Sequence, residues 1–128
     1  DRDLLDGLYM ASSLFVFPSL YDTAGLVVRE ASVMGTPSVV VKGTAPAEVI
    51  RDGVNGLLCE DNTESLSNTI EHYLFRLSDQ ERLNIRSQAQ TSIPLPWETV
   101  MKEVEVRYQA LIARGKSKRK RRLKDLIQ

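Results

Sequence analysis

Two patterns of hydrophobic and polar residues alternate along the chain, and together they predict strands separated by helices. Continuous apolar runs rich in aromatic or β-branched residues predict three short buried strands, over 14–17, 38–41 and 56–59. Apolar residues with helical spacing, or stretches bounded by capping and breaking residues, predict helices over 3–12, 25–34, 46–51, 62–77, 78–90 and from 97 onward. This alternation indicates parallel βαβ units, so we expect an α/β fold with an open sheet.

Single residues predict where several of these helices begin and end. Asp1 or Asp3 can cap the first helix, Asn62 or Thr63 can cap the helix that follows the third strand, and Ser78-x-x-Glu81 forms a capping box. The first helix has no strand before it, and three strands make a small sheet. We therefore expect the natural domain to begin upstream of residue 1.

Composition limits the class of protein. The 128 residues, 42% of them hydrophobic, suit a single domain with a core. No apolar run reaches the length of a membrane span, and the acidic start differs from a signal peptide. One cysteine and one histidine exclude a disulfide framework within the chain and argue against a structural zinc site. We expect a cytoplasmic protein, either soluble or peripheral to the membrane. We expect no metal site, because the sequence shows no acidic cluster that could hold a metal ion.

Charge divides the chain into an acidic body, residues 1–113, and a basic tail, residues 114–128. The body carries 9 basic and 16 acidic side chains, whereas residues 114–124 (RGKSKRKRRLK) carry 8 basic residues and no acid. The tail has three interpretations: a solvated, disordered end, a segment that binds anionic lipid headgroups, or a nucleic-acid contact. The acidic body and the lack of a recognition fold argue against nucleic acid.

A candidate ligand site follows the first strand. Ligands of open α/β sheets bind beyond the carboxyl ends of the strands, where residues 19–24 lie. Gly25 opens the next helix, whose free N–H groups suit a phosphate. Glu30, roughly 7–8 Å further along the helix, could bind the hydroxyl groups of a ribose, and Asp22 could bind those of a sugar. From spacing alone, a purely structural helix is the more common explanation.

Three motifs in order strengthen the ligand hypothesis. The chain reads F-P-S at 17–19, D-T-A-G-L-V-V-R-E-A-S-V-M-G-T-P-S-V-V at 22–40 and G-T-A-P-A-E-V-I-R-D-G-V-N-G-L-L at 43–58, followed by W-E at 97–98. It thereby resembles glycosyltransferase family 4, the glycosyl transferases group 1, which are retaining enzymes of the GT-B fold. The resemblance covers nearly all of residues 4–113.

The resemblance implies a role for each matching position. Glu30 would bind the ribose of the donor nucleotide, Asp22 the transferred sugar, and the backbone N–H groups of Gly25 and Leu26 the diphosphate. Other possible contacts are Ser19, Thr23, Lys42 and Thr44. A turn residue at the strand end is an equally good explanation for Ser19, and a solvated surface lysine is the more common explanation for Lys42. Two departures bear on activity: Asp22 replaces the family's longer glutamate, and Ala24 replaces its usual phenylalanine.

The implied reaction moves a hexosyl unit from a nucleotide diphosphate sugar to a glycan, lipid or polysaccharide precursor. The family's catalytic arginine and lysine precede the segment matched here, so no catalytic residue is assigned, and we expect the chain alone to be inactive. The acceptor site would lie mainly in an N-terminal domain. The alternatives are a non-catalytic nucleotide-sugar-binding or partner module and a GT-B nucleotide-sugar epimerase.

The resemblance also predicts a partial Rossmann-like parallel sheet. The three strands would be numbers 4, 5 and 6 of the order 3-2-1-4-5-6, with helices on both faces. Strand 14–17 would then lack its neighbour, strand 1. Because an unpaired apolar edge promotes association, we expect the chain to self-associate through that strand.

Overall fold

The computed structural model describes the backbone of residues 1–125 and the side chains of residues 1–115. The chain consists of two compact units, Asp1–Pro94 and Leu95–Gln128, and each is described by itself. No helix in the described part is long and apolar enough to span a membrane.

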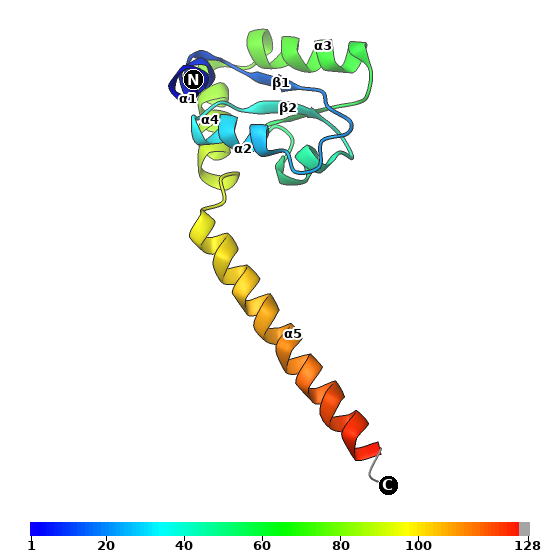
Figure 1. The fold of residues 1–128 in the computed structure, drawn as a ribbon. Coiled ribbons are helices and arrows are strands. Elements are labelled where there is room, and N and C mark those ends of the chain that lie inside the picture. The colour runs from blue at the N-terminus through cyan, green and yellow to red at the C-terminus, as the bar shows by residue number, and fades with distance from the viewer. Residues whose placement is uncertain (126–128) are drawn as a thin grey trace. The chain divides into compact units, whose positions relative to one another are not determined.

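The first unit is built on a parallel sheet of three strands (Figure 1), in the order β1-β2-β3. β1 (Phe15–Phe17) pairs with β2 (Ser38–Val41), which in turn pairs with β3 (Leu57–Cys59). The register places Val16 beside Val39 and Leu58 beside Val40. The α/β fold and the parallel sheet expected from the alternating pattern are confirmed, and β1 and β3 form the two edges of the sheet.

Helices connect and cover these strands as the sequence predicts, within a few residues at each end. The α-helices are α1 (Arg2–Ala11), α2 (Leu26–Val33), α3 (Thr63–Glu71), α4 (Asp79–Ser92) and α5 (Trp97–Asp125). Two predicted segments differ in type. The segment expected over 46–51 is a 3₁₀-helix, η1 (Ala45–Val49), and the helix expected over 62–77 ends in one turn of π-helix, η2 (His72–Arg76).

Two hydrophobic clusters lie on opposite faces of the central strand β2. Val39 and Val41 pack with Tyr73 on the face that α3 covers. Val40 points the other way and packs with Val28 of α2 and Ala89 of α4. Since successive side chains of a strand alternate between faces, a strand buried on both sides must be apolar throughout, which explains the run 38–41.

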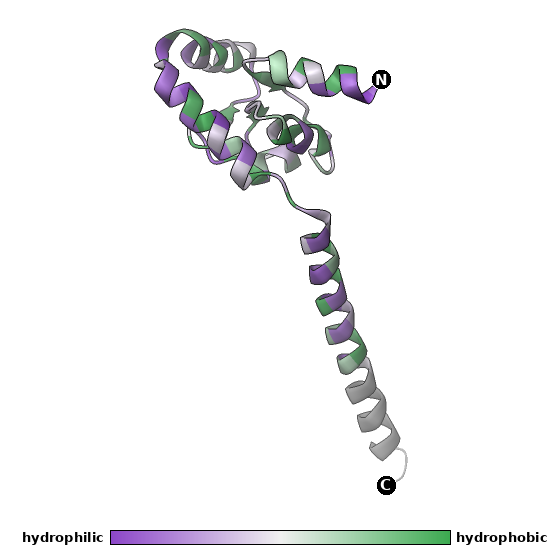
Figure 2. Ribbon diagram, turned by 90° about the vertical axis from the view of Figure 1, so that its left-hand side faces the viewer, coloured by the Kyte–Doolittle hydropathy of each residue, from purple (hydrophilic) through white to green (hydrophobic). Residues whose placement is uncertain are grey.

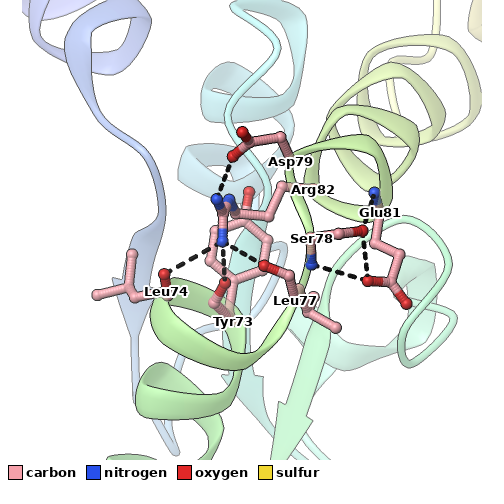
Figure 3. Close-up of polar contacts among 7 residues, drawn as sticks. All are labelled: Tyr73, Leu74, Leu77, Ser78, Asp79, Glu81 and Arg82. Atoms are coloured by element: carbon pink, nitrogen blue, oxygen red, sulfur yellow. Dashed lines mark hydrogen bonds and ion pairs between the residues drawn. The ribbon is translucent and has the colours of Figure 1, made fainter.

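Side-chain hydrogen bonds stabilise the turn between η2 and α4 (Figure 3). Ser78 and Glu81 form the predicted capping box, in which each side chain accepts a hydrogen bond from the other residue's backbone N–H. The Arg82 guanidinium donates to the carbonyl oxygens of Leu74 at 3.1 Å and Leu77 at 2.6 Å, and it also pairs with Asp79. These bonds satisfy carbonyl groups that the end of a helix leaves without partners.

The D-G-x-N-G motif at 52–56 holds the loop before β3 in place. Asn55 is only 2% exposed. It accepts a hydrogen bond from the Arg51 N–H and donates to the Val49 carbonyl and to the Ser92 hydroxyl. Gly56 is packed so tightly that a Cβ atom there would lie 2.9 Å from Cδ1 of Ile50. This part of the motif therefore stabilises the fold.

The second unit is dominated by the single helix α5. Hydrophilic and hydrophobic residues alternate along its described part (Figure 2), and Trp97, Tyr108 and Leu111 are exposed. Its backbone is helical through Asp125. The three interpretations of the basic tail stay predictions. The predicted boundary between residues 113 and 114 falls within α5 and stays a prediction.

Candidate functional site

The carboxyl ends of the strands carry the predicted site, and Gly25 determines its shape. Gly25 is the N-cap of α2 with φ 58° and ψ 32°, the left-handed region that favours glycine. A Cβ atom at this position would lie 2.9 Å from the Cα of Pro46. The start of α2 is thus packed directly against η1, the 3₁₀-helix that follows β2. Two segments that the sequence placed at this end of the sheet do meet there.

The Asp22 carboxylate is turned toward its own loop. Its Oδ1 accepts hydrogen bonds from the backbone N–H groups of Gly25 and Ala24. These bonds, that from Gly25 foremost, hold the pKa of Asp22 below its ordinary value, because they stabilise the ionised form. Asp22 is therefore a carboxylate at neutral pH, and it already occupies one of the two N–H groups predicted to hold a diphosphate.

Two other N–H groups at the start of α2 are free. In the part of the chain that the structure describes, the backbone N–H groups of Leu26 and Val27 have no hydrogen-bond acceptor, whereas those of Val28 and Arg29 donate to the Gly25 carbonyl. Free amides at a helix N-terminus favour an anion. Leu26 was predicted for this role. Val27 was not, because the match to the family extends the diphosphate contact only to Gly25 and Leu26.

Glu30, one helical turn further on, is paired with Arg2 of α1. The Arg2 guanidinium donates to Glu30 Oε1 at 3.1 Å and also lies 3.3 Å from Asp6 Oδ1. The hydrogen bond to Glu30 is the main cause that raises the pKa of Arg2. The Glu30 side chain remains 31% exposed. No pattern in the sequence predicts this contact, since 28 residues separate the two partners.

Of the remaining residues predicted to contact a ligand, two form hydrogen bonds within the protein and two lie in a surface loop. Lys42 pairs with Glu60, and this hydrogen bond raises the pKa of Lys42. The Thr44 hydroxyl donates to the Val41 carbonyl at 2.7 Å. Ser19 is half-buried and Thr23 is exposed, both in the loop between β1 and α2. Their roles toward a ligand stay predictions.

A hollow of about 370 Å³ lies at the same end of the sheet, next to α3. It is lined by Pro18, Val41, Cys59, Glu60, Asp61, Asn62, Thr63 and Leu66. The predicted contacts at Asp22, Gly25 and Glu30 are not among these residues. The start of α2 is thus not part of this hollow.

Two other expectations concern metals and the tail. Among the described residues, no three histidine, cysteine, aspartate or glutamate side chains form a group that could hold a metal ion. The expected contact of the basic tail with an anionic surface depends mostly on side chains at positions 116–128, which lie outside those that the structure describes.

Comparison with known proteins defines the class. The sequence model of the glycosyl transferases group 1 matches residues 1–91, and the chain belongs to this family. It is 28% identical over 102 residues to an uncharacterised glycosyltransferase of Methanocaldococcus jannaschii, covering 79% of this chain and 26% of that protein. Over 123 residues it is 28% identical to the D-inositol 3-phosphate glycosyltransferase of Mycobacterium tuberculosis, covering 94% of this chain and 25% of that protein.

Solved structures agree with this assignment. The sucrose-phosphate synthase of Thermosynechococcus elongatus superposes with a TM-score of 0.69 at 27% identity, covering 88% of this chain and 29% of that one. HepE of Anabaena, solved in complex with UDP, superposes with a TM-score of 0.55 at 24% identity, covering 80% and 28%. The latter shows the fold alone. The chain spans about a quarter of the length of the two glycosyltransferases compared above.

Proposed function

We propose that the chain forms the C-terminal part of the donor-binding domain of a glycosyltransferase. The enzyme would transfer a hexosyl unit from a nucleotide diphosphate sugar to an acceptor, with retention of the anomeric configuration. The observation that carries the proposal is the start of α2, where the Leu26 and Val27 N–H groups are free one turn before Glu30. Family membership and the named relatives support glycosyl transfer as the reaction.

Each part of the donor would have its own partner. The diphosphate would accept hydrogen bonds from the free amides of α2 and gain from the positive end of the helix dipole. The Glu30 carboxylate would accept hydrogen bonds from the two ribose hydroxyls, replacing its bond to Arg2. Asp22 would bind the hydroxyls of the transferred sugar after turning away from Gly25, which would release a third amide for the diphosphate.

The catalytic groups would lie outside this chain. A retaining enzyme with a covalent intermediate needs a carboxylate nucleophile close to the anomeric carbon, and neither Asp22 nor Glu30 is proposed for that role. We assign departure of the diphosphate and attack of the acceptor to the same face of the sugar, with upstream cationic residues stabilising the leaving group. The chain alone would bind a donor weakly and would not catalyse transfer. No metal or other cofactor enters the proposal.

The acceptor would be a glycan, a lipid or a polysaccharide precursor bound mainly by an N-terminal domain. We propose a cytoplasmic location, with the basic tail contacting the anionic headgroups of a membrane. Each clustered Lys or Arg contributes about 1 kcal/mol near such a surface. Loss of vesicle binding on removal of residues 114–128 would support this contact, and unchanged binding would contradict it.

Amide NMR on the 128-residue chain tests the donor site. UDP, GDP and ADP are titrated separately, and the expected result is a shift of the Leu26 and Val27 amide signals by one of them. Glu30→Ala should weaken that binding about tenfold. The variant loses two charge-assisted hydrogen bonds to the ribose, and each contributes less than a buried bond because the site is partly exposed to solvent. Glu71→Ala, an exposed carboxylate paired with Arg76, is the matched control. Shifts elsewhere, or equal affinity of the two variants, would contradict the proposal.

A non-catalytic nucleotide-sugar-binding module is the second candidate. It is favoured by the orientation of Asp22, whose shorter side chain is bound to the backbone of its own loop. Asp22→Glu would decide between them in a full-length protein that contains this segment. A rise in transfer rate would support the enzyme, and donor binding without any transfer in either form would support the module.

A further inference from the structure

A polar groove follows the free edge of β3, away from the site described above. It consists of two adjoining hollows, of about 520 Å³ and 310 Å³, that share Gly53, Leu57 and His72. These volumes fall in the lower range of small-molecule sites. The larger hollow lies between α3 and the 52–58 segment, and the smaller one extends toward α4. The buried side chain of Leu57 forms part of the floor.

The edge of β3 is closed to an added strand. Cys59 turns its carbonyl to Lys42 beyond β2, so its neighbours Leu58 and Glu60 direct their N–H groups away from β2. The Leu58 N–H donates to Asp52 Oδ1 at 2.9 Å, and the Glu60 N–H donates to the Ser65 hydroxyl at 2.9 Å. An extended peptide would find both donors occupied. Recognition in this groove must therefore depend on side chains.

The side chains of the larger hollow supply both donors and acceptors. Glu64, Asn68 and His72 follow one another at helical spacing, and their side chains make no hydrogen bond in the described part of the chain. Asn62 uses only its carbonyl oxygen, as the cap of α3, and keeps its amide donors. Thr69 donates to the Ser65 carbonyl and keeps its acceptor capacity.

This combination selects among ligand classes. The carboxylates of Asp52 and Glu64, with Glu81 in the smaller hollow, disfavour a phosphate or any other anion. An amine offers donors alone and would leave the Asn62 and Asn68 amide groups without acceptors. A hydroxyl group both donates and accepts, and several on one ring match the mixed set along the groove.

We propose that the groove along β3 binds a neutral saccharide, with Asn68 and His72 as its central contacts. His72 is placed at the junction of the two hollows by the start of η2, a π-helical turn of a kind frequent at functional sites. A chain of sugar units can follow the groove from α3 toward α4. The inference uses no residue of the α2 site and stands apart from donor binding.

Amide NMR of the 128-residue chain tests it with uncharged oligosaccharides of glucose, mannose and galactose. At least one series should shift the amide signals of Gly53, Asn68 and His72. Asn68→Ala and His72→Ala should each weaken this binding about fivefold, as loss of one hydrogen bond predicts. Ser67→Ala, an exposed neighbour on the same helix, and Glu30→Ala at the α2 site should leave the affinity unchanged.

Other results would overturn the assignment. One is the absence of shifts at these amides with every neutral series. Another is equal affinity of Asn68→Ala and Ser67→Ala, which would place the saccharide elsewhere. A third is displacement of the saccharide series by spermidine or glucuronate oligomers as the better ligand, which would assign the groove to a cation or an anion. Failure of the groove proposal can be distinguished from failure of the donor-site proposal, because Glu30→Ala should affect nucleotide binding and leave saccharide binding unchanged.

Discussion

Gly25 stands so close to Pro46 that a Cβ atom on residue 25 would lie 2.9 Å from the Cα of Pro46. The contact joins the start of α2 to η1, which follows β2. Gly25 also has φ 58°, so two independent requirements, backbone conformation and space, demand glycine there. The free amides of Leu26 and Val27 follow directly after this contact in the chain.

Gly25→Ala should therefore lower the free energy of unfolding by about 2–4 kcal/mol, the sum of left-handed strain and overpacking. Gly43→Ala is the matched control, since Gly43 has φ 75° but a Cβ atom added there would have nothing within 4 Å. It should cost only about 1–2 kcal/mol. Urea denaturation measures both, and equal losses would show that Pro46 yields to the added carbon.

Asn55→Ala should cost about 2–3 kcal/mol, because it leaves the Arg51 N–H and the Val49 carbonyl without their partner in a buried position. Asn84→Ala, an exposed residue that accepts only from Gln80, should change stability by less than about 0.5 kcal/mol. Thermal and urea unfolding of both variants provide the comparison. A loss at Asn55 no greater than that at Asn84 would refute the structural role of the motif.

Arg82→Lys should cost about 1–2 kcal/mol despite the retained charge. A lysine ammonium lacks the planar fork with which Arg82 reaches the Leu74 and Leu77 carbonyls together (Figure 3). Arg76→Lys, at an exposed arginine with a single ion pair to Glu71, should change stability by no more than about 0.5 kcal/mol. The same denaturation experiment checks both, and a neutral Arg82→Lys would mean that charge alone suffices.

The Glu81 carboxylate should make the free energy of unfolding fall as the pH is lowered. Hydrogen bonds from the Ser78 hydroxyl, then from its backbone N–H, hold the pKa of Glu81 below its ordinary value. Its contribution is complete above the pKa of an unfolded glutamate, about 4.3, and is lost as pH falls through the lower pKa of the folded chain. Glu81→Gln cannot titrate, so its unfolding free energy should fall less steeply with acid than that of the wild type. Parallel slopes would contradict this role.

Val16→Lys should suppress the self-association expected through β1. Val16 is the central residue of this edge strand and is 41% exposed, and a lysine on an edge strand opposes pairing with another chain. Sedimentation velocity over a range of concentrations should show association of the wild type and at least about tenfold weaker association of the variant. Val54→Lys, at a 43% exposed valine in a turn, should behave as the wild type. A monomeric wild type would end this hypothesis.

The sequence predicted the elements because their signals are local. The β-branched run 38–41 defines a strand that is buried on both faces, and Asn62 and Ser78 act on amides three residues away. The motifs likewise placed Gly25 at the turn into α2. Such contacts depend on spacing within one segment, which the sequence displays directly.

What the sequence missed depends on segments far apart in the chain. Nothing at position 2 marks Arg2 as the partner of Glu30, because the packing of α1 beside α2 creates that pair. An aspartate in a loop can point its carboxylate into solvent or bond the backbone of its own loop, and the residue type alone does not decide between the two. The groove beside β3 unites the 52–58 segment with α3 and α4, so no single motif reveals it.

The occupied amides of Leu58 and Glu60 limit how copies of this chain can associate by strand pairing. A filament requires each copy to present two complementary edges, one to join its predecessor and one to receive its successor. Here Asp52 and Ser65 block the β3 side, which leaves only β1 to accept a neighbour. Association of this chain by strand pairing would therefore stop at an isologous pair with two-fold symmetry, instead of proceeding to a polymer.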